Sequence, residues 1–214
     1  MNRILVATRN PDKLREIRSI LDDPDLPGLL DLTAVGIPES DEEDDLERFE
    51  SFEENALAKA HYFASLSGLV TLADDSGLCV DALQGAPGVR SKRFSGRTDL
   101  TGPELDLANN LYLIHRMHGV PDSTRTASYV CAIAIASPSG AEATVRGSCA
   151  GQILNEPRGD GGFGYDPYFL IPDRRMTVAE LPPATKNMIS HRARALHELR
   201  ETISRRLDLF GSGL

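Results

Sequence analysis

The sequence predicts an α/β fold, because runs with a strand pattern alternate with runs that have helix periodicity. Residues 4–7 are apolar and end at a turn signal, and apolar residues then recur at helical spacing from 11 to 21. Residues 69–73 form another apolar run, which follows a second helix pattern. Residues 127–136 and 143–153 alternate or run apolar on either side of a Pro-Ser-Gly turn, which predicts an antiparallel hairpin.

Length and composition are those of an ordinary globular protein. The chain has 214 residues, of which 41% are hydrophobic and 26% charged, enough for one large domain or two small lobes. The net charge of −9 argues against broad nucleic-acid binding, which requires a basic face. A small anionic ligand is compatible with it, because a few lysines can create a local positive site.

The cysteines and the apolar runs predict a soluble, cytoplasmic protein. Cys79, Cys131 and Cys149 are odd in number and far apart, which indicates reduced thiols and neither a disulfide framework nor a zinc site. The apolar run at the N-terminus has only four residues, too short for a signal peptide. The longest apolar run, 130–136, is far below the roughly 20 residues that cross a bilayer.

The first strand, loop and helix favour an anion above the end of the strand. Asn10 is placed to cap the helix, Pro11 lies in its first turn, and Lys13 follows. Backbone N–H groups at a helix start and a nearby lysine together suit a phosphate. An ordinary capped helix with a surface lysine is the alternative.

An acidic segment precedes the second helix. After a second strand expected around residues 30–35, eight of the twelve residues from 39 to 50 are acidic. Such a run is usually solvated or flexible, and we expect this of most of it. Glu47 is the exception, because it lies just before the next helix and could reach a cation.

The second helix carries two polar residues on one stripe. Ser51 and Glu54 form a capping box that predicts where the helix begins. Asn55 and Lys59 are four residues apart and therefore share one face. For Lys59, a simple solvated lysine is the alternative to a place in a site.

The stretch 72–96 is rich in glycine and poor in large apolar side chains, so we expect it to line a cleft and not to form core. It opens with Asp74 and Asp75, followed by Ser76. Successive strand side chains point to opposite faces, so only one of the two carboxylates should face a given ligand, and the other should support it. The letters D-D-S-G are also typical of a turn.

The helix pattern at 105–117 is amphipathic. Leu107, Leu111 and Ile114 recur at helical spacing, which predicts a face that packs in the core.

A second distinctive stretch, 159–167, contains four glycines around Phe163 and Tyr165. Its glycines let the backbone approach a ligand closely, and its aromatic rings offer faces on which a base can stack. A tight loop with the aromatic rings tucked into the core is the alternative.

The last helix begins beside several potential cations. Lys186, His191 and Arg192 lie just before it or in its first turn. A helix N-terminus already favours anions, so cations gathered there argue for a bound anion or an electronegative ligand edge.

The combination of these features is more informative than any one of them. The chain has no Walker-type phosphate loop and no G-x-G-x-x-G after a strand. Lysines at two helix starts, carboxylates suited to a hard cation, a glycine-aromatic loop and a His-Arg pair together predict a nucleotide with its magnesium.

The chain resembles the inosine/xanthosine triphosphate pyrophosphatase family over nearly its whole length. Five motifs in one order carry the resemblance: ATRNPDKLREI at 7–17, SFEENALAKA at 51–60, ADDSGLCVDALQGAPGVRSKRFSG at 73–96, GGFGYDPYF at 161–169 and KNMISHRARAL at 186–196. The resemblance implies a two-lobed α/β fold, a long twisted mixed β-sheet flanked by helices with the active cleft between the lobes. Residues 1–214 would form a single catalytic domain, usually in a homodimer.

The resemblance also implies an activity. Such enzymes hydrolyse ITP, dITP and XTP to the monophosphate and pyrophosphate with Mg²⁺, which removes these nucleotides before they enter DNA or RNA. Phosphoryl transfer needs positioning and charge neutralisation, which magnesium and lysines supply. Hydrogen-bond donors at the base edge would favour a 6-keto purine over adenine, whose 6-amino group is itself a donor.

Carried over residue by residue, the family's roles fall on matching positions. Asp75 would be the general base and a metal ligand, and Glu47 the second metal ligand. Ser76 would contact the substrate near the metal. The phosphate oxygens would be held by Thr8, Arg9, Asn10, Lys13 and Lys59, of which the two lysines also serve catalysis. The base and sugar wall would be Phe163, Gly164, Tyr165 and Asp166, and the base edge would be read by Lys186, His191 and Arg192.

Some alternatives stay open at this point. Glu43 and Asp44 compete with Glu47 as metal ligands, and Lys92 stands where the family commonly has a small residue. A metal-dependent phosphatase or nuclease acting on polynucleotide would need a basic groove, against which the net charge weighs. A nucleotide-binding regulator would have no need of Asp75 and Lys13 together.

Overall fold

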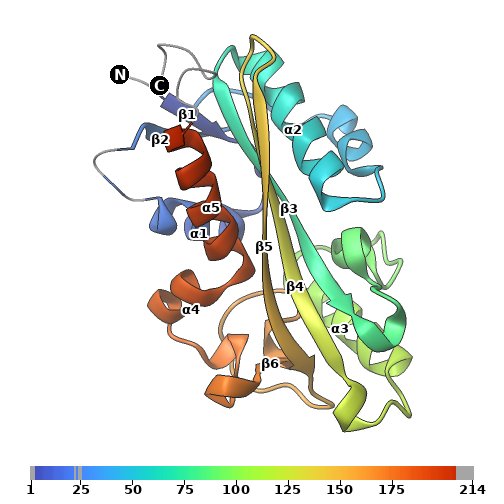
Figure 1. Ribbon diagram of the computed structural model, residues 1–214. Helices are drawn as coiled ribbons and strands as arrows, with labels where there is room; N and C mark the ends of the chain where they lie inside the picture. Colours follow the sequence, from blue (N-terminus) through green and yellow to red (C-terminus); the bar gives the residue numbers. More distant parts are fainter. Residues whose placement is uncertain (1–2, 22, 24–25, 206–214) are drawn as a thin grey trace. The chain divides into compact units, whose positions relative to one another are not determined.

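The computed structural model describes residues 3–21, 23 and 26–205 (Figure 1). The strands are β1 Arg3–Val6, β2 Gly28–Asp31, β3 Val70–Val80, β4 Thr126–Ala136, β5 Glu142–Ile153, β6 Phe169–Ile171 and β7 Met176–Thr177. The α-helices are α1 Pro11–Ile20, α2 Phe52–Ser67, α3 Gly102–Arg116, α4 Pro183–Ile189 and α5 His191–Arg205. Short 3₁₀ helices include η1 Asp41–Glu47, η3 Gly88–Arg93 and η5 Asp166–Tyr168. No helix in these residues is long and apolar enough to cross a membrane.

The described strands form one mixed sheet in the order β2-β1-β3-β4-β5-β6-β7. β1 pairs in parallel with β2 and with β3, where Leu5 lies opposite Leu30 and Thr71. β6 pairs antiparallel with β5 and with β7. Helices flank the sheet, so the prediction of an α/β fold is confirmed.

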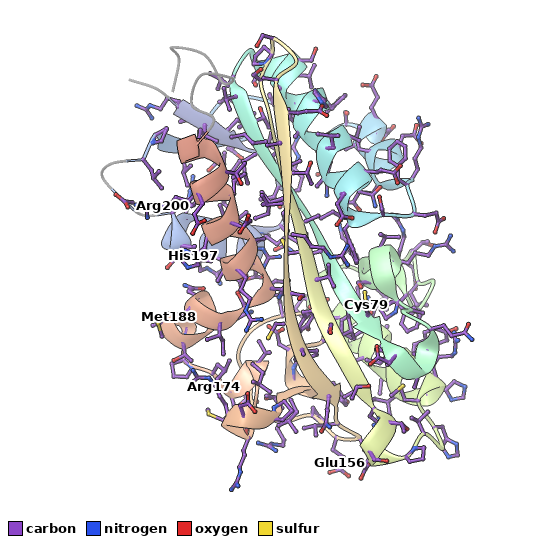
Figure 2. The ribbon with its side chains drawn as sticks, in the orientation of Figure 1. Cys79, Glu156, Arg174, Met188, His197 and Arg200 are labelled. Atoms are coloured by element: carbon purple, nitrogen blue, oxygen red, sulfur yellow. The ribbon has the colours of Figure 1, made fainter. Side chains whose placement is uncertain are left out.

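The chain divides into two compact units, each with its own core. The first unit comprises the described residues of 1–75, 131–147 and 191–205, and its core includes Val6, Ile17 and Ile133. Arg200 lies on α5 of this unit (Figure 2). It pairs with Asp23 at 2.6 Å. The second unit comprises 76–130 and 148–190. Its core joins residues of β3, α3, β4, β5 and β6, among them Leu78, Leu113, Tyr129 and Phe169.

The second strand ends earlier than the sequence predicts. β2 covers Gly28–Asp31, whereas residues 32–36 form a turn. The Oδ1 atom of Asp31 accepts a hydrogen bond from the Ala34 backbone N–H at 2.7 Å, which closes this turn. A side chain that bonds the backbone three residues on competes with strand pairing, so the expected strand at 30–35 is wrong for most of its length.

The acidic segment is ordered, although most of its side chains are exposed as expected. Residues Asp41–Glu47 form η1, a 3₁₀ helix that begins with a capping box between Ser40 and Glu43. The expectation of a solvated segment is therefore confirmed by this exposure, and capping bonds and the cations described below offset the repulsion between neighbouring acids.

The D-D-S-G sequence lies inside β3 and does not form a turn. Leu72, Leu78 and Val80 on this strand are buried in the two cores. The first part of the stretch 72–96 is thus core strand, contrary to our expectation, because these three apolar residues pack in the cores.

The face of α3 that packs inward is the predicted one only in part. Of the three residues expected in the core, Ile114 packs against it. Leu107 and Leu111 are 57% and 58% exposed, whereas Leu113 and Met117 are fully buried. Asn109 and Asn110 are buried as well. Apolar spacing was misleading here because the inward face carries polar residues, which bind a loop of the second unit as described below.

Candidate functional site

Strand alternation separates the two adjacent carboxylates of β3, as predicted. In the first unit, Asp74 faces α1 and α5, from which Lys13 and Arg192 reach its Oδ2 atom at 3.1 and 3.2 Å. Asp75 faces α2, which lies on the other side of β3 from α5 in Figure 1. Both carboxylates are buried. Each therefore needs compensating partners, and the two sets of partners are different.

Asp75 is held by the polar stripe of α2. The Asn55 amide donates to its Oδ2 atom at 3.0 Å, and the Lys59 Nζ atom lies 3.4 Å from its Oδ1 atom. Burial raises the pKa of Asp75, although the charges of Lys59 and Lys13 oppose this shift. A carboxylate whose pKa is raised toward neutrality is better suited to take a proton from water than an ordinary exposed one.

Lys59 is no solvated lysine. Its side chain is buried, and its Nζ atom donates to Glu47 Oε1 at 2.8 Å and to the Asp74 carbonyl at 2.7 Å. Burial alone would lower its pKa, but Glu47, Asp75 and Asp74 outweigh it and the pKa is raised. The lysine therefore stays charged, and it gathers Glu47 and Asp75 around one ammonium group.

Asn55 also fixes the chain between η1 and α2. Its Oδ1 atom accepts from the Phe49 N–H at 2.9 Å, and its Nδ2 atom donates to the Phe49 carbonyl at 3.3 Å. The sequence placed Asn55 and Lys59 on one stripe but assigned no role to Asn55. The four-residue spacing was the signal that could have indicated one.

Asp74 carries two cations inside the first unit. Burial alone would raise its pKa, but Lys13, Arg192 and Lys59 outweigh that cost and hold the pKa well below its usual value. Arg192, with a side chain only 1% exposed, also pairs with Glu16 of α1. This network places Lys13 at the N-terminus of α1, where Asn10 Oδ1 caps the Asp12 and Lys13 N–H groups at 2.8 and 3.1 Å.

These pairings involve two residues that were predicted to contact the ligand, and both roles stay predictions. Arg192 was expected to read the base edge, and its guanidinium is buried against Asp74 and Glu16. Arg9 was expected to hold phosphate, and its guanidinium pairs with Glu43 at 2.6 Å. Local sequence could not reveal either pairing, because the partners are far away along the chain.

Among the other predicted residues of the first unit, Thr8 lies in the loop before α1, where its Oγ1 atom accepts from the Asn10 N–H at 3.2 Å. His191 is buried at the start of α5. Glu43 is engaged by Arg9, as Glu47 is by Lys59, so which acid of the segment binds a metal stays a prediction. The side chain of Asp44 lies outside the described residues.

In the second unit the glycine-aromatic loop is built around Asp166. Its Oδ2 atom accepts from the Lys186 ammonium at 2.8 Å and from the Phe163 N–H at 3.0 Å, and its Oδ1 atom accepts from the Tyr129 hydroxyl at 3.1 Å. At Gly162, with φ +75°, a Cβ atom would lie 2.1 Å from Asp166 Oδ2. Glycine is therefore required for the loop to fold over this carboxylate.

The loop presents one aromatic face next to a cation. Phe163 is half-buried, and the Lys186 Nζ atom lies 4.7 Å from the centre of its ring. Tyr165 is instead in the core, and its hydroxyl donates to the Ser91 carbonyl at 2.7 Å. For Tyr165 the alternative of a ring tucked into the core is the one observed. Ser76 lies half-exposed on β3.

Sequence reasoning missed the residues of α3 that hold this loop. The Gly164 N–H donates to Asp106 Oδ2 at 2.8 Å, and the Asn110 amide donates to the Gly164 carbonyl at 2.8 Å. Asp106, Asn110 and Leu113 recur at helical spacing. This polar stripe next to an apolar residue was the available signal.

The oxygen ligands of the first unit fit a magnesium ion that is completed by substrate. Within the described parts of the chain, no three His, Cys, Asp or Glu side chains are arranged to hold a metal ion by themselves. Glu47 and Asp75 both bond the same ammonium, at 2.8 and 3.4 Å, so their carboxylates lie close together. Mg²⁺ is typically bound by one or two carboxylates together with water and substrate phosphates.

The fold and these two sites define an α/β protein with buried lysines and paired carboxylates in one unit, and with a cation over an aromatic face in the other. More specifically, the chain belongs to the Ham1 family, whose model matches residues 4–202.

Relatives of known name are similar in sequence along nearly the whole length of the chain. The dITP/XTP pyrophosphatase of Geobacter sulfurreducens is 49% identical over 201 residues, which cover 94% of this chain and 96% of that protein. The dITP/XTP pyrophosphatase of Nocardia farcinica is 48% identical and covers 93% of each chain. The HAM1 protein of Coxiella burnetii has a similar structure, with a TM-score of 0.82 and 37% identity over 96% of this chain and 100% of that one.

Proposed function

We propose that this protein hydrolyses the non-standard purine nucleotides ITP, dITP and XTP to the nucleoside monophosphate and pyrophosphate. The observation that carries this proposal is the identity of 49% and 48% to two proteins named dITP/XTP pyrophosphatase, over more than nine-tenths of the chain. The reaction removes these nucleotides from the pool before they are incorporated into DNA or RNA.

The first unit supplies the groups that phosphate hydrolysis needs. Glu47 and Asp75 would hold a Mg²⁺ ion, which when bound neutralises charge on the triphosphate. Lys13 and Lys59 bind phosphate oxygens, helped by the capped N-terminus of α1. Asp75 accepts the proton of the attacking water, and Asn55 keeps its carboxylate in position.

The second unit supplies a place for the base. Phe163 offers a half-exposed ring for stacking, and Asp166 holds the Lys186 ammonium beside that ring. A purine stacked there would have its edge near a hydrogen-bond donor. A donor matches the 6-keto oxygen of hypoxanthine or xanthine and mismatches the 6-amino group of adenine. For His191 and Arg192, which belong to the first unit, contact with the base edge stays a prediction.

A nucleotide-binding regulator is the other class to consider. Such a regulator would need the aromatic face of Phe163 for stacking. It would not need Asp75, a buried carboxylate of raised pKa beside Lys59. That the chain is a homodimer, lies in the cytoplasm and works as one catalytic domain over residues 1–214 stays a prediction.

A nucleotide panel tests the proposed activity. With Mg²⁺ present, we expect kcat/KM for ITP, dITP and XTP to exceed that for ATP by at least about 100-fold, because a donor at the base edge mismatches the 6-amino group of adenine. Little turnover of GTP is also expected, from the names of the relatives and not from this donor, because guanine has a 6-keto oxygen as well. Turnover is followed by anion-exchange separation of the nucleotides, and EDTA is the control for metal dependence. Equal turnover of ATP and ITP would contradict the proposal, and binding without turnover of any nucleotide would favour the regulator.

A further inference from the structure

Arg9 connects the loop before α1 to the acidic segment. Its Nε and NH2 atoms donate to the two carboxylate oxygens of Glu43 at 3.0 and 2.6 Å. Its NH1 and NH2 atoms also donate to the carbonyls of Ile37 and Pro38, at 3.1 and 2.7 Å. One guanidinium thus makes four hydrogen bonds to residues 37–43, all within the first unit.

These contacts fix the N-terminal end of η1. Glu43 also accepts from the Ser40 N–H at 3.3 Å, so the same carboxylate caps the helix and binds Arg9. Tyr62 of α2 donates to the neighbouring Glu42 at 3.0 Å. The segment is therefore tied at its start to the α1 loop and to α2, and at its end Glu47 binds Lys59 at 2.8 Å.

A segment of sequence DEEDDLE needs such ties, because adjacent like charges repel one another. Bidentate pairing of arginine with a carboxylate is among the stronger and more directional charged contacts. The side chains of Arg9 and Glu43 are 28% and 15% exposed, so the pair is partly shielded from solvent. Both oxygens of the Glu43 carboxylate are thereby directed toward the Arg9 guanidinium.

We propose that Arg9 is a positioning residue which selects the metal ligand of the acidic segment: it holds Glu43 and thereby places Glu47 beside Lys59 and Asp75. This inference rests on the proposed function, because it assumes that Glu47 and Asp75 bind Mg²⁺. Arg9 lies between Thr8 and Asn10, so the same residue ties the proposed phosphate loop to the proposed metal ligand.

Metal affinity, measured with and without nucleotide, tests this role. Arg9→Gln and Glu43→Gln should each weaken Mn²⁺ binding to the nucleotide-free protein by about tenfold, the size of effect typical for residues that support metal ligands. Mn²⁺ binding is read by electron paramagnetic resonance. The Mg²⁺ concentration for half-maximal hydrolysis of ITP should rise by a similar factor. Arg9→Lys should not restore affinity, since an ammonium cannot form the paired contact.

Arg18→Gln is the matched control. Arg18 lies on α1 of the same unit, and its ion pair is with Asp31 of β2 at 2.7 Å, not with the acidic segment. Its loss should leave Mn²⁺ affinity unchanged. Unchanged affinity in Arg9→Gln, or equal weakening in Arg18→Gln, would overturn the proposal. If the wild-type protein hydrolysed none of the nucleotides, the proposed function would fail, whereas the Mn²⁺ measurements would still decide the role of Arg9.

Discussion

Replacing Asp75 with asparagine is expected to abolish turnover of ITP, with kcat reduced by roughly 10³-fold or more, while nucleotide binding stays largely intact. Asparagine keeps the shape of the side chain but cannot take a proton from water, a step that is commonly worth about 10²- to 10⁴-fold in rate. The variant also removes one proposed metal ligand. Lys59 keeps its contacts to Glu47 and to the Asp74 carbonyl, so the phosphate-binding cation remains in place.

The experiment compares single-turnover rates with nucleotide affinity from calorimetry, on the same protein preparation. Asp99→Asn is the control, because Asp99 is an exposed carboxylate paired with Arg97 and far along the chain from the proposed machinery. It should retain wild-type activity. An active Asp75→Asn enzyme would remove Asp75 as the general base, and loss of nucleotide binding in it would assign Asp75 to binding instead.

Asp74→Asn is expected to reduce the free energy of unfolding by about 3–5 kcal/mol, the usual cost of breaking a buried ion pair from one side. Arg192 is 1% exposed and stays charged, and Lys13 shares the same Oδ2 atom. Asparagine would leave both cations without their shared negative charge. The second carboxylate near Arg192, that of Glu16, offsets only part of this loss.

Urea denaturation measures this difference. Asp31→Asn is the matched control, because Asp31 pairs with Arg18, which is half-exposed. Asparagine also keeps the Oδ1 atom of residue 31, which closes a turn. Exposed ion pairs contribute about 0–1 kcal/mol to the free energy of unfolding, so the loss in the control variant should lie in that range. A loss below about 1 kcal/mol for Asp74→Asn would contradict a supporting role of Asp74 through its buried charge.

Features set by local periodicity could be predicted from the sequence. The separation of Asp74 from Asp75 follows from strand alternation, and the shared face of Asn55 and Lys59 follows from helical spacing. The cap at Asn10 was also predictable, because it depends on residues no more than three positions away. Each of these contacts is decided within one element.

Features that depend on distant partners could not be predicted. Arg192 binds Asp74 across 118 positions, and Arg9 binds Glu43 across 34. Both arginines look from the sequence like available cations. On α3, apolar spacing favoured Leu107 and Leu111 as the inward face, but both are exposed. The inward face instead carries Asp106 and Asn110, which hydrogen-bond the backbone of Gly164. Hydrophobic pattern alone does not contain that requirement.

The identity of the phosphorus product tests the central claim most directly. ITP is incubated with the wild-type protein and Mg²⁺, without added inorganic pyrophosphatase, and the products are followed by ³¹P nuclear magnetic resonance. We expect IMP and pyrophosphate in equal amounts from the first turnovers. Formation of orthophosphate with IDP would contradict it.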